Sequence, residues 1–235
     1  MKNLFAIASI VLLHLLAGCG SGKQLTQKKL GADSYFIAKN YGEALRSYKE
    51  IINTYETNNN SSECQVYTNA GESALNLGET KLAISYLKSA SNTKYANELT
   101  YYYLAKAYKK IDNLSLEILT LNDYIDLYPQ GNNIIDIKKR LFFTYVESDN
   151  FDKALEIWPE IVPVDHKSPD LLEAYFKINK ELGNTDECST IGNQLLDIDP
   201  YNLTALTWFG KMYYRKAEDR YQKEMKAYDK KKTNK

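Results

Sequence analysis

The side chains that most often perform nucleophilic or metal chemistry, cysteine and histidine, are few in this chain and widely separated. Three cysteines and two histidines occur in 235 residues, and His166 has no second histidine or cysteine near it in sequence. Metal sites need several clustered ligands, so we expect His166 to be a solvated loop residue. The sequence has no glycine-rich phosphate loop, nucleophile elbow or zinc-type spacing. We therefore predict a protein that is not an enzyme, with no metal, cofactor or small-molecule substrate.

The charged residues also argue against catalysis and against nucleic-acid binding. Paired carboxylates such as Glu218 and Asp219 stand among lysines and arginines, which is typical of a salt-bridged helix surface. The chain holds 30 basic and 30 acidic residues, whereas nucleic-acid binding needs a net basic face. We therefore expect no nucleic-acid binding. We also expect a folded protein, because 44% of its residues are hydrophobic.

The first cysteine, Cys19, ends an apolar segment and is a candidate for covalent modification. A short basic start, an apolar run over residues 4–16 and two small residues before Cys19 are typical of a secretory signal. Leu-Ala-Gly-Cys at 16–19 resembles the lipobox of bacterial lipoproteins. The resemblance implies that residues 1–18 are a cleaved signal peptide, that Cys19 is acylated, with palmitate for example, and that 19–26 form a lipidated tether. An ordinary signal peptide with an incidental cysteine, or a short buried helix, are the alternatives.

The residues after Cys19 bear on location. Gly20, Ser21 and Gly22 form a flexible tether, and no aspartate follows the cysteine to signal inner-membrane retention. We expect attachment through N-terminal acyl chains to the cell envelope, at the outer membrane of a Gram-negative bacterium. The sequence leaves open whether the protein faces the periplasm or the exterior.

A helical repeat occupies most of the remaining chain. Small residues return at Ala44, Ala83, Ala154 and Cys188, with Glu117 between them, at intervals of 39, 34, 37 and 34 residues. A period close to 34 predicts stacked helix-turn-helix units. The pattern resembles the tetratricopeptide repeat (TPR), which implies an all-α fold, a right-handed α-solenoid. The repeats would span 27–205, as 27–60, 64–96, 98–130, 135–167 and 169–201, followed by a long helix and basic tail over 206–235.

Several positions agree with this pattern, and others depart from it. Gly78 and Gly183 stand where a left-handed residue would end a first helix. Glu117 replaces a small residue, so its hairpin is expected to splay, and Pro159 is expected to kink or shorten its helix. Polar insertions over 57–62 and 131–133 are interpreted as loops.

The two later cysteines lie in different repeats. Because each repeat of a solenoid contacts only its neighbours, we expect no disulfide between Cys64 and Cys188. Cys188 occupies a small-residue position and is expected in the core, whereas Cys64 follows polar residues and is expected to be partly exposed.

The resemblance also implies a binding surface, because the first helices of successive TPRs line a concave groove. Matching the groove-facing positions gives a set of aromatic and basic side chains: Tyr102, Lys106, Lys109, Lys139, Phe143, Lys177 and Tyr214. Such a surface could hold an extended peptide, with carboxylates on the lysines and apolar side chains on the aromatics. The alternative is that Lys106, Lys109 and Lys110 are only a solvated helix face, and the family's carboxylate clamp is not reproduced.

These features together predict a lipid-anchored TPR scaffold that binds an unidentified protein or peptide in its groove. Two further hypotheses stay open. One is an accessory lipoprotein of the outer-membrane β-barrel assembly machine, which the chain resembles in size and layout. The other is a non-catalytic subunit of a secretion or cell-wall system.

The C-terminal segment carries an apolar stripe at steps of three or four residues and ends in lysines. It is expected to cap the repeat array in its first half. A partner-binding helix, or a chain that natively continues, is the alternative for its second half. The stripe consists of Leu206, Phe209, Tyr213, Ala217, Tyr221, Met225 and Tyr228.

Overall fold

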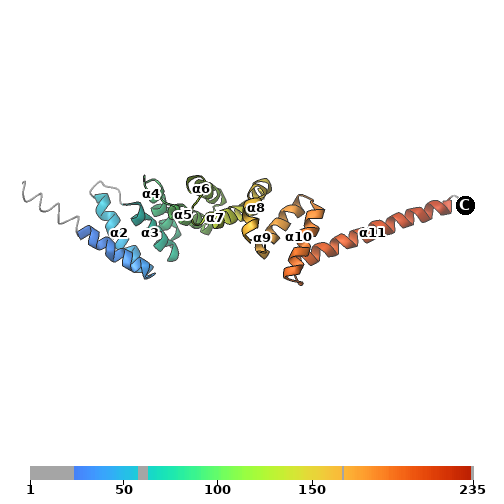
Figure 1. Ribbon diagram of the computed structural model, residues 1–235, viewed down its shortest axis with the longest axis horizontal. Helices are drawn as coiled ribbons and strands as arrows, with labels where there is room; N and C mark the ends of the chain where they lie inside the picture. The colour runs from blue at the N-terminus through green and yellow to red at the C-terminus, as the bar shows by residue number, and fades with distance from the viewer. Residues whose placement is uncertain (1–23, 58–62, 166, 234–235) are drawn as a thin grey trace, which may run out of the picture. The chain divides into compact units, whose positions relative to one another are not determined.

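The computed structural model describes residues 24–57, 63–165 and 167–233, and within them every regular element is an α-helix. A helix over residues 24–37 comes first (Figure 1). The labelled helices follow in this order: α2 (Tyr41–Thr57), α3 (Cys64–Asn76), α4 (Thr80–Ser91), α5 (Glu98–Lys110), α6 (Leu114–Leu127), α7 (Ile134–Glu147), α8 (Phe151–Asp165), α9 (Pro169–Glu181), α10 (Thr185–Ile198) and α11 (Leu203–Thr233).

The chain divides into two compact units, residues 1–144 and 145–235. In the first unit α3 packs against α2, α4 and α5, and α5 packs against α6. In the second unit α10 packs against both α9 and α11. Most of these contacts join helices that are neighbours in sequence, as expected of stacked helical hairpins.

A residue with left-handed backbone geometry stands in each of five interhelix turns. Gly78 and Gly183 have φ of 81° and 75°, which confirms their predicted role, and Lys39, Asp112 and Asp149 have φ of 57°, 53° and 52°. These five positions are separated by 39, 34, 37 and 34 residues, the same intervals as the small-residue positions. The turns therefore repeat in phase with the small-residue positions. Lys39 is the unusual member, because residues other than glycine, asparagine and aspartate seldom adopt this geometry.

Local side-chain bonds fix where several helices begin. The side chains of Asn97 and Asn113 accept hydrogen bonds from the third residue beyond them, at the start of α5 and α6. Ser168 caps α9 in the same way, and Pro169 occupies its first turn. Each cap satisfies a backbone N–H that the helix leaves unpaired.

The small-residue positions form the interior of the hairpins. Ala44, Ala83 and Ala154 are completely buried and Cys188 is 1% exposed, which confirms that Cys188 fills a core position. Glu117 is completely buried as well, and α5 and α6 pack against each other. The expected splaying of this hairpin is therefore wrong, because the carboxylate has a buried partner that is described below.

Two further expectations are corrected. Cys64 is only 6% exposed and not partly exposed as expected. Its Sγ lies 3.7 Å from the Ala90 carbonyl oxygen and 3.8 Å from Thr68 Oγ1, because Cys64 is the first residue of α3 and its side chain points into the core. α8 includes both Pro159 and Pro163, so Pro159 does not shorten it, and the kink stays a prediction. Cys64 and Cys188 are both free thiols.

The polar insertion over 131–133 lies between α6 and α7, as predicted. Several other predictions fall outside the described residues: the signal segment with Cys19, residues 58–62 and His166. None of the helices in the described part of the chain is long and apolar enough to span a bilayer.

α11 starts three residues before the predicted segment and, with 31 residues, is the longest of the described helices (red in Figure 1). Ala205 is buried in the core of the second unit, and Trp208 packs against that core. Beyond Met212 every described side chain of α11 is exposed. The first turns of α11 thus cover the end of the second unit, as predicted for a capping helix.

Candidate functional site

Four side chains of α3 and α5 form a connected polar and aromatic cluster in the first unit. The Tyr103 hydroxyl donates a hydrogen bond to the Glu72 carboxylate. Lys106 also interacts electrostatically with Glu72, and its Nζ lies 5.9 Å from the centroid of the Tyr102 ring. Tyr102 and Tyr103 pack edge to face with centroids 5.2 Å apart. We call Glu72, Tyr102, Tyr103 and Lys106 the Glu72 cluster.

Burial sets the electrostatics of this cluster. It raises the pKa of the Glu72 carboxyl above its ordinary range, and the hydrogen bond from Tyr103 and the charge of Lys106 only partly oppose the rise. Burial and the bond to Glu72 likewise raise the pKa of Tyr103. Lys106 itself is exposed, whereas Tyr102 and Glu72 are half-buried, so the cluster presents a cation to solvent beside an aromatic ring and an acid.

The predicted residues on α5 and α7 are partly embedded. Tyr102, Lys109, Lys139 and Phe143 are half-buried, and Phe143 packs edge to face against Phe142 at 5.6 Å between centroids. The structure brings Tyr102 and Lys106 together on α5, and Lys139 and Phe143 one turn apart on α7. Sequence reasoning did not single out Tyr103, although the run of three tyrosines over 101–103 was a usable signal.

Lys177, predicted to face the groove, has a structural role. Its Nζ donates to the Val146 carbonyl oxygen at 3.2 Å, pairs with Asp149 at 3.4 Å, and lies 5.8 Å from the centroid of the Phe151 ring. These contacts join α9 to the end of α7 within the second unit. Tyr214, the remaining predicted residue, is 70% exposed on α11.

The Lys177 contact belongs to a recurring arrangement. Lys110 of α5 donates to the Leu75 carbonyl oxygen of α3 at 3.2 Å, and Arg140 of α7 donates to the Ala105 carbonyl oxygen of α5 at 3.1 Å. In each case a basic side chain reaches a carbonyl in the C-terminal half of the preceding repeat's first helix. The carbonyls of Leu75 and Val146 lie in the last turn, where cations are favourable. Lys110, one of the lysines interpreted as a possible solvated face, thus bonds the backbone of α3.

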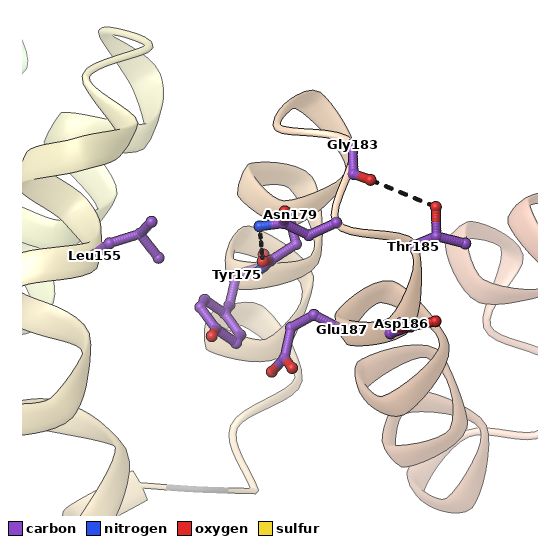
Figure 2. Close-up of a pocket in the computed structure, with 8 residues that line it drawn as sticks. Leu155, Tyr175, Asn179, Gly183, Thr185, Asp186 and Glu187 are labelled. Atoms are coloured by element: carbon purple, nitrogen blue, oxygen red, sulfur yellow. Dashed lines mark hydrogen bonds between the residues drawn. The ribbon is translucent and has the colours of Figure 1, made fainter.

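The second unit contains a pocket of about 690 Å³, lined by residues of α8, α9 and α10 and the turn between α9 and α10. Figure 2 shows Leu155 on α8 facing Tyr175 on α9, with Glu187 of α10 beside the tyrosine. The Tyr175 ring stacks on Trp158 with centroids 4.1 Å apart. Asn179, nearly buried, donates to the Tyr175 carbonyl oxygen at 2.9 Å.

This pocket offers hydrogen-bonding and aromatic groups rather than a catalytic set. Its eight lining residues are Leu155, Tyr175, Asn179, Gly183, Asn184, Thr185, Asp186 and Glu187. The described part of the chain also holds no group of three histidine, cysteine or acidic residues suited to a metal. No sequence pattern predicted the pocket, because its residues come from three helices.

The helix pairs, their period and their in-phase turns define the fold as an all-α TPR solenoid, which confirms the predicted fold class. No family model and no curated protein matches the sequence. Among solved structures, YrrB, described as a TPR protein with an unusual peptide-binding site, is 16% identical at TM-score 0.64. That match covers 76% of this chain and 88% of YrrB.

Structures of MamA are similar in fold as well. One is 20% identical, covering 77% of this chain and 97% of MamA, at TM-score 0.62. Another, of MamA from AMB-1, is 14% identical, covering 79% of this chain and 97% of that one, at TM-score 0.65. These similarities concern the fold.

Proposed function

We propose that this chain is a non-catalytic protein-interaction scaffold that holds an extended segment of a partner protein against the Glu72 cluster and the neighbouring face of α7. The observation that carries the proposal is the pairing of exposed Lys106 with the Tyr102 ring on α5. A helical repeat array offers surfaces of this kind for binding rather than for chemistry. The peptide-binding site ascribed to YrrB is consistent with this use of the fold.

The chemistry of the surface indicates the kind of segment it would hold. Lys106 can pair with a carboxylate of the partner, and the edges and faces of Tyr102 and Phe143 can contact apolar side chains. Lys109 and Lys139 are half-buried on the same two helices and add positive potential. A segment with acidic and apolar residues in alternation fits this surface best.

Charge reversal tests the surface directly. Lys106→Glu should abolish capture of the native partner in a crosslinking pull-down from intact cells, because it replaces attraction with repulsion. Lys88→Glu, which changes the same charge at an exposed position on α4, is the matched control and should capture normally. Unchanged capture by the Lys106 variant would remove the proposal.

We further propose that acylation at Cys19 holds the scaffold on the bacterial envelope, at the outer membrane, and so concentrates its partner there. The Leu-Ala-Gly-Cys sequence at 16–19 supports this proposal. Metabolic labelling with a palmitate analogue should mark the wild type and a Cys64→Ala control. Cys19→Ala should remain unlabelled and move to the soluble fraction, and a variant that stays labelled or membrane-bound contradicts acylation at Cys19.

The partner recovered in the pull-down decides between the more specific hypotheses. Recovery of the β-barrel assembly protein would support the accessory-lipoprotein hypothesis. Recovery of components of one secretion or cell-wall system, and nothing of the β-barrel machine, would support a non-catalytic subunit of that system.

A further inference from the structure

The part of α11 after Gly210 is much more basic than the rest of the chain. Residues 211–232 contain nine of the 30 basic residues and only four of the 30 acidic ones. This segment therefore has a net charge of +5, and the remainder of the chain has five more acidic than basic residues. Such an uneven distribution indicates a partner of negative charge.

The two faces of α11 show that this segment is not built to bind another repeat. Positions seven apart lie on the same face of an α-helix. Ala205 and Met212 share the face that covers the second unit and are buried and half-buried, respectively. The same face continues as Asp219 and Lys226, both exposed, so the apolar packing surface ends after Met212.

A second stripe, made of tyrosines, lies on the opposite side of this segment. Tyr214, Tyr221 and Tyr228 are also seven residues apart, and their exposed fractions are 70%, 59% and 63%. Met225, 40% exposed, lies beside them. The stripe is made mostly of tyrosine, whose ring is apolar and whose hydroxyl can remain hydrated.

We propose that residues 211–232 of α11 lie along an anionic lipid surface, with the tyrosine stripe at the level of the headgroups and the lysines and arginines attracted to the lipid phosphates. Tyrosine is enriched at the membrane–water interface, and a basic helix with an aromatic stripe is the usual form of an interfacial helix. At 1.5 Å per residue the segment extends roughly 33 Å. If the helix lies flat, the distance from its charges to the lipid phosphates is at most about a helix diameter. That distance is comparable to the Debye length, near 8 Å, so salt screens the attraction only partly.

The charge and composition favour lipid over the other occupants of this face. A second copy would place two segments of net charge +5 against each other, which opposes pairing. A protein groove for a helix is usually filled by bulky apolar anchors at steps of three and four, whereas this stripe has one methionine among tyrosines. The proposal rests neither on the Glu72 cluster nor on acylation at Cys19.

Hydrogen exchange measured by mass spectrometry on the full chain tests the proposal. Vesicles of phosphatidylcholine with phosphatidylglycerol should slow exchange of the amides over 213–230, and vesicles of phosphatidylcholine alone should not. The N-terminal apolar segment can attach the chain to either vesicle, so only the dependence on phosphatidylglycerol reports on α11. High salt should remove the protection, because it screens the charges.

Two sets of substitutions separate the contributions. Lys216→Glu, Lys223→Glu and Lys226→Glu together should weaken the phosphatidylglycerol-dependent association at least about a hundredfold, since each basic residue near an anionic leaflet contributes roughly fivefold. A variant in which Tyr214, Tyr221 and Tyr228 are all changed to Ser keeps the net charge and should also lose the protection from exchange. The matched control changes the exposed Lys81, Lys88 and Lys94 to Glu and should behave as wild type.

Several results would overturn the proposal. They are equal protection by both vesicle types, no protection by either, or a triple lysine variant that binds like wild type. Protection by polyglutamate but not by vesicles would assign the helix to an acidic protein surface instead. Protection that depends on protein concentration without vesicles would assign it to self-association.

Discussion

Arg140 of α7 donates a hydrogen bond of 2.7 Å from Nε to the carboxylate of Glu117 on α6, whose side chain is completely inaccessible to solvent. The same guanidinium donates from Nη2 to the Ala105 carbonyl oxygen on α5. One side chain thus ties three helices of the first unit together. It also explains how a carboxylate can occupy a position that small residues hold in the other repeats.

Removal of Arg140 should be severe, because it leaves the Glu117 carboxylate buried without its counter-charge. We expect Arg140→Leu to lower the free energy of unfolding by about 3–5 kcal/mol, measured by urea denaturation. Glu117→Ala combined with Arg140→Leu should recover most of that loss, since it restores a small residue and removes both charges. A cost below about 1 kcal/mol for Arg140→Leu would show that the pair contributes little.

Glu72 should make stability depend on pH in the direction opposite to most carboxylates. Burial raises its pKa in the folded protein, so between the ordinary and the raised value the folded state binds more protons than the unfolded chain. The free energy of unfolding therefore falls as pH rises through that interval. Glu72→Gln should flatten this part of the profile, while Glu56→Gln, at an exposed position on α2, should leave it unchanged. An identical slope in wild type and Glu72→Gln would contradict the assignment.

Gly71 and Gly210 are both helical glycines, yet alanine should affect them in opposite ways. A Cβ at Gly71 would lie 2.5 Å from Leu87 Cγ, whereas one at Gly210 would meet nothing within 4 Å. Gly71→Ala should therefore destabilise by about 1–3 kcal/mol through overpacking. Gly210→Ala should stabilise by about 0.5–1 kcal/mol through helix propensity. Thermal unfolding of the two variants checks both signs, and a stable Gly71→Ala would mean that α3 and α4 pack less tightly than described.

Lys177 should matter for stability and not for partner capture. Lys177→Met keeps the aliphatic stem but loses the bonds to Val146 and Asp149, which should cost about 1 kcal/mol. Urea denaturation measures that cost, and the crosslinking pull-down should give the same yield as wild type. Loss of capture with stability intact would restore Lys177 to the binding surface.

The repeat and its phase could be predicted because they depend on residue types that recur at fixed intervals. The two turn glycines were visible in the sequence for the same reason. Lys39, Asp112 and Asp149 adopt the same left-handed geometry. Lysine seldom adopts it, and aspartate, although it tolerates it, is too common in the chain to mark a turn by itself.

The parts of the site that escaped prediction depend on contacts between repeats. Arg140 lies 23 residues after Glu117, and no local pattern connects a buried acid with a base in the next repeat. Lys177 stood at a position that faces the groove in the family, yet the nearby Val146 carbonyl and Asp149 hold it. The family pattern thus selected lysines by their position along the helix, but it could not predict which of them the structure holds in contacts between repeats.

The central claim, that the α5 surface binds a partner segment, can be tested by photocrosslinking in intact cells. A photoreactive amino acid at position 102 should give a discrete adduct with one protein, and Lys106→Glu should abolish it while Lys88→Glu leaves it intact. The same probe at position 85, which is exposed on α4, should not give that adduct. No adduct from position 102, or one that persists with Lys106→Glu, would contradict the account.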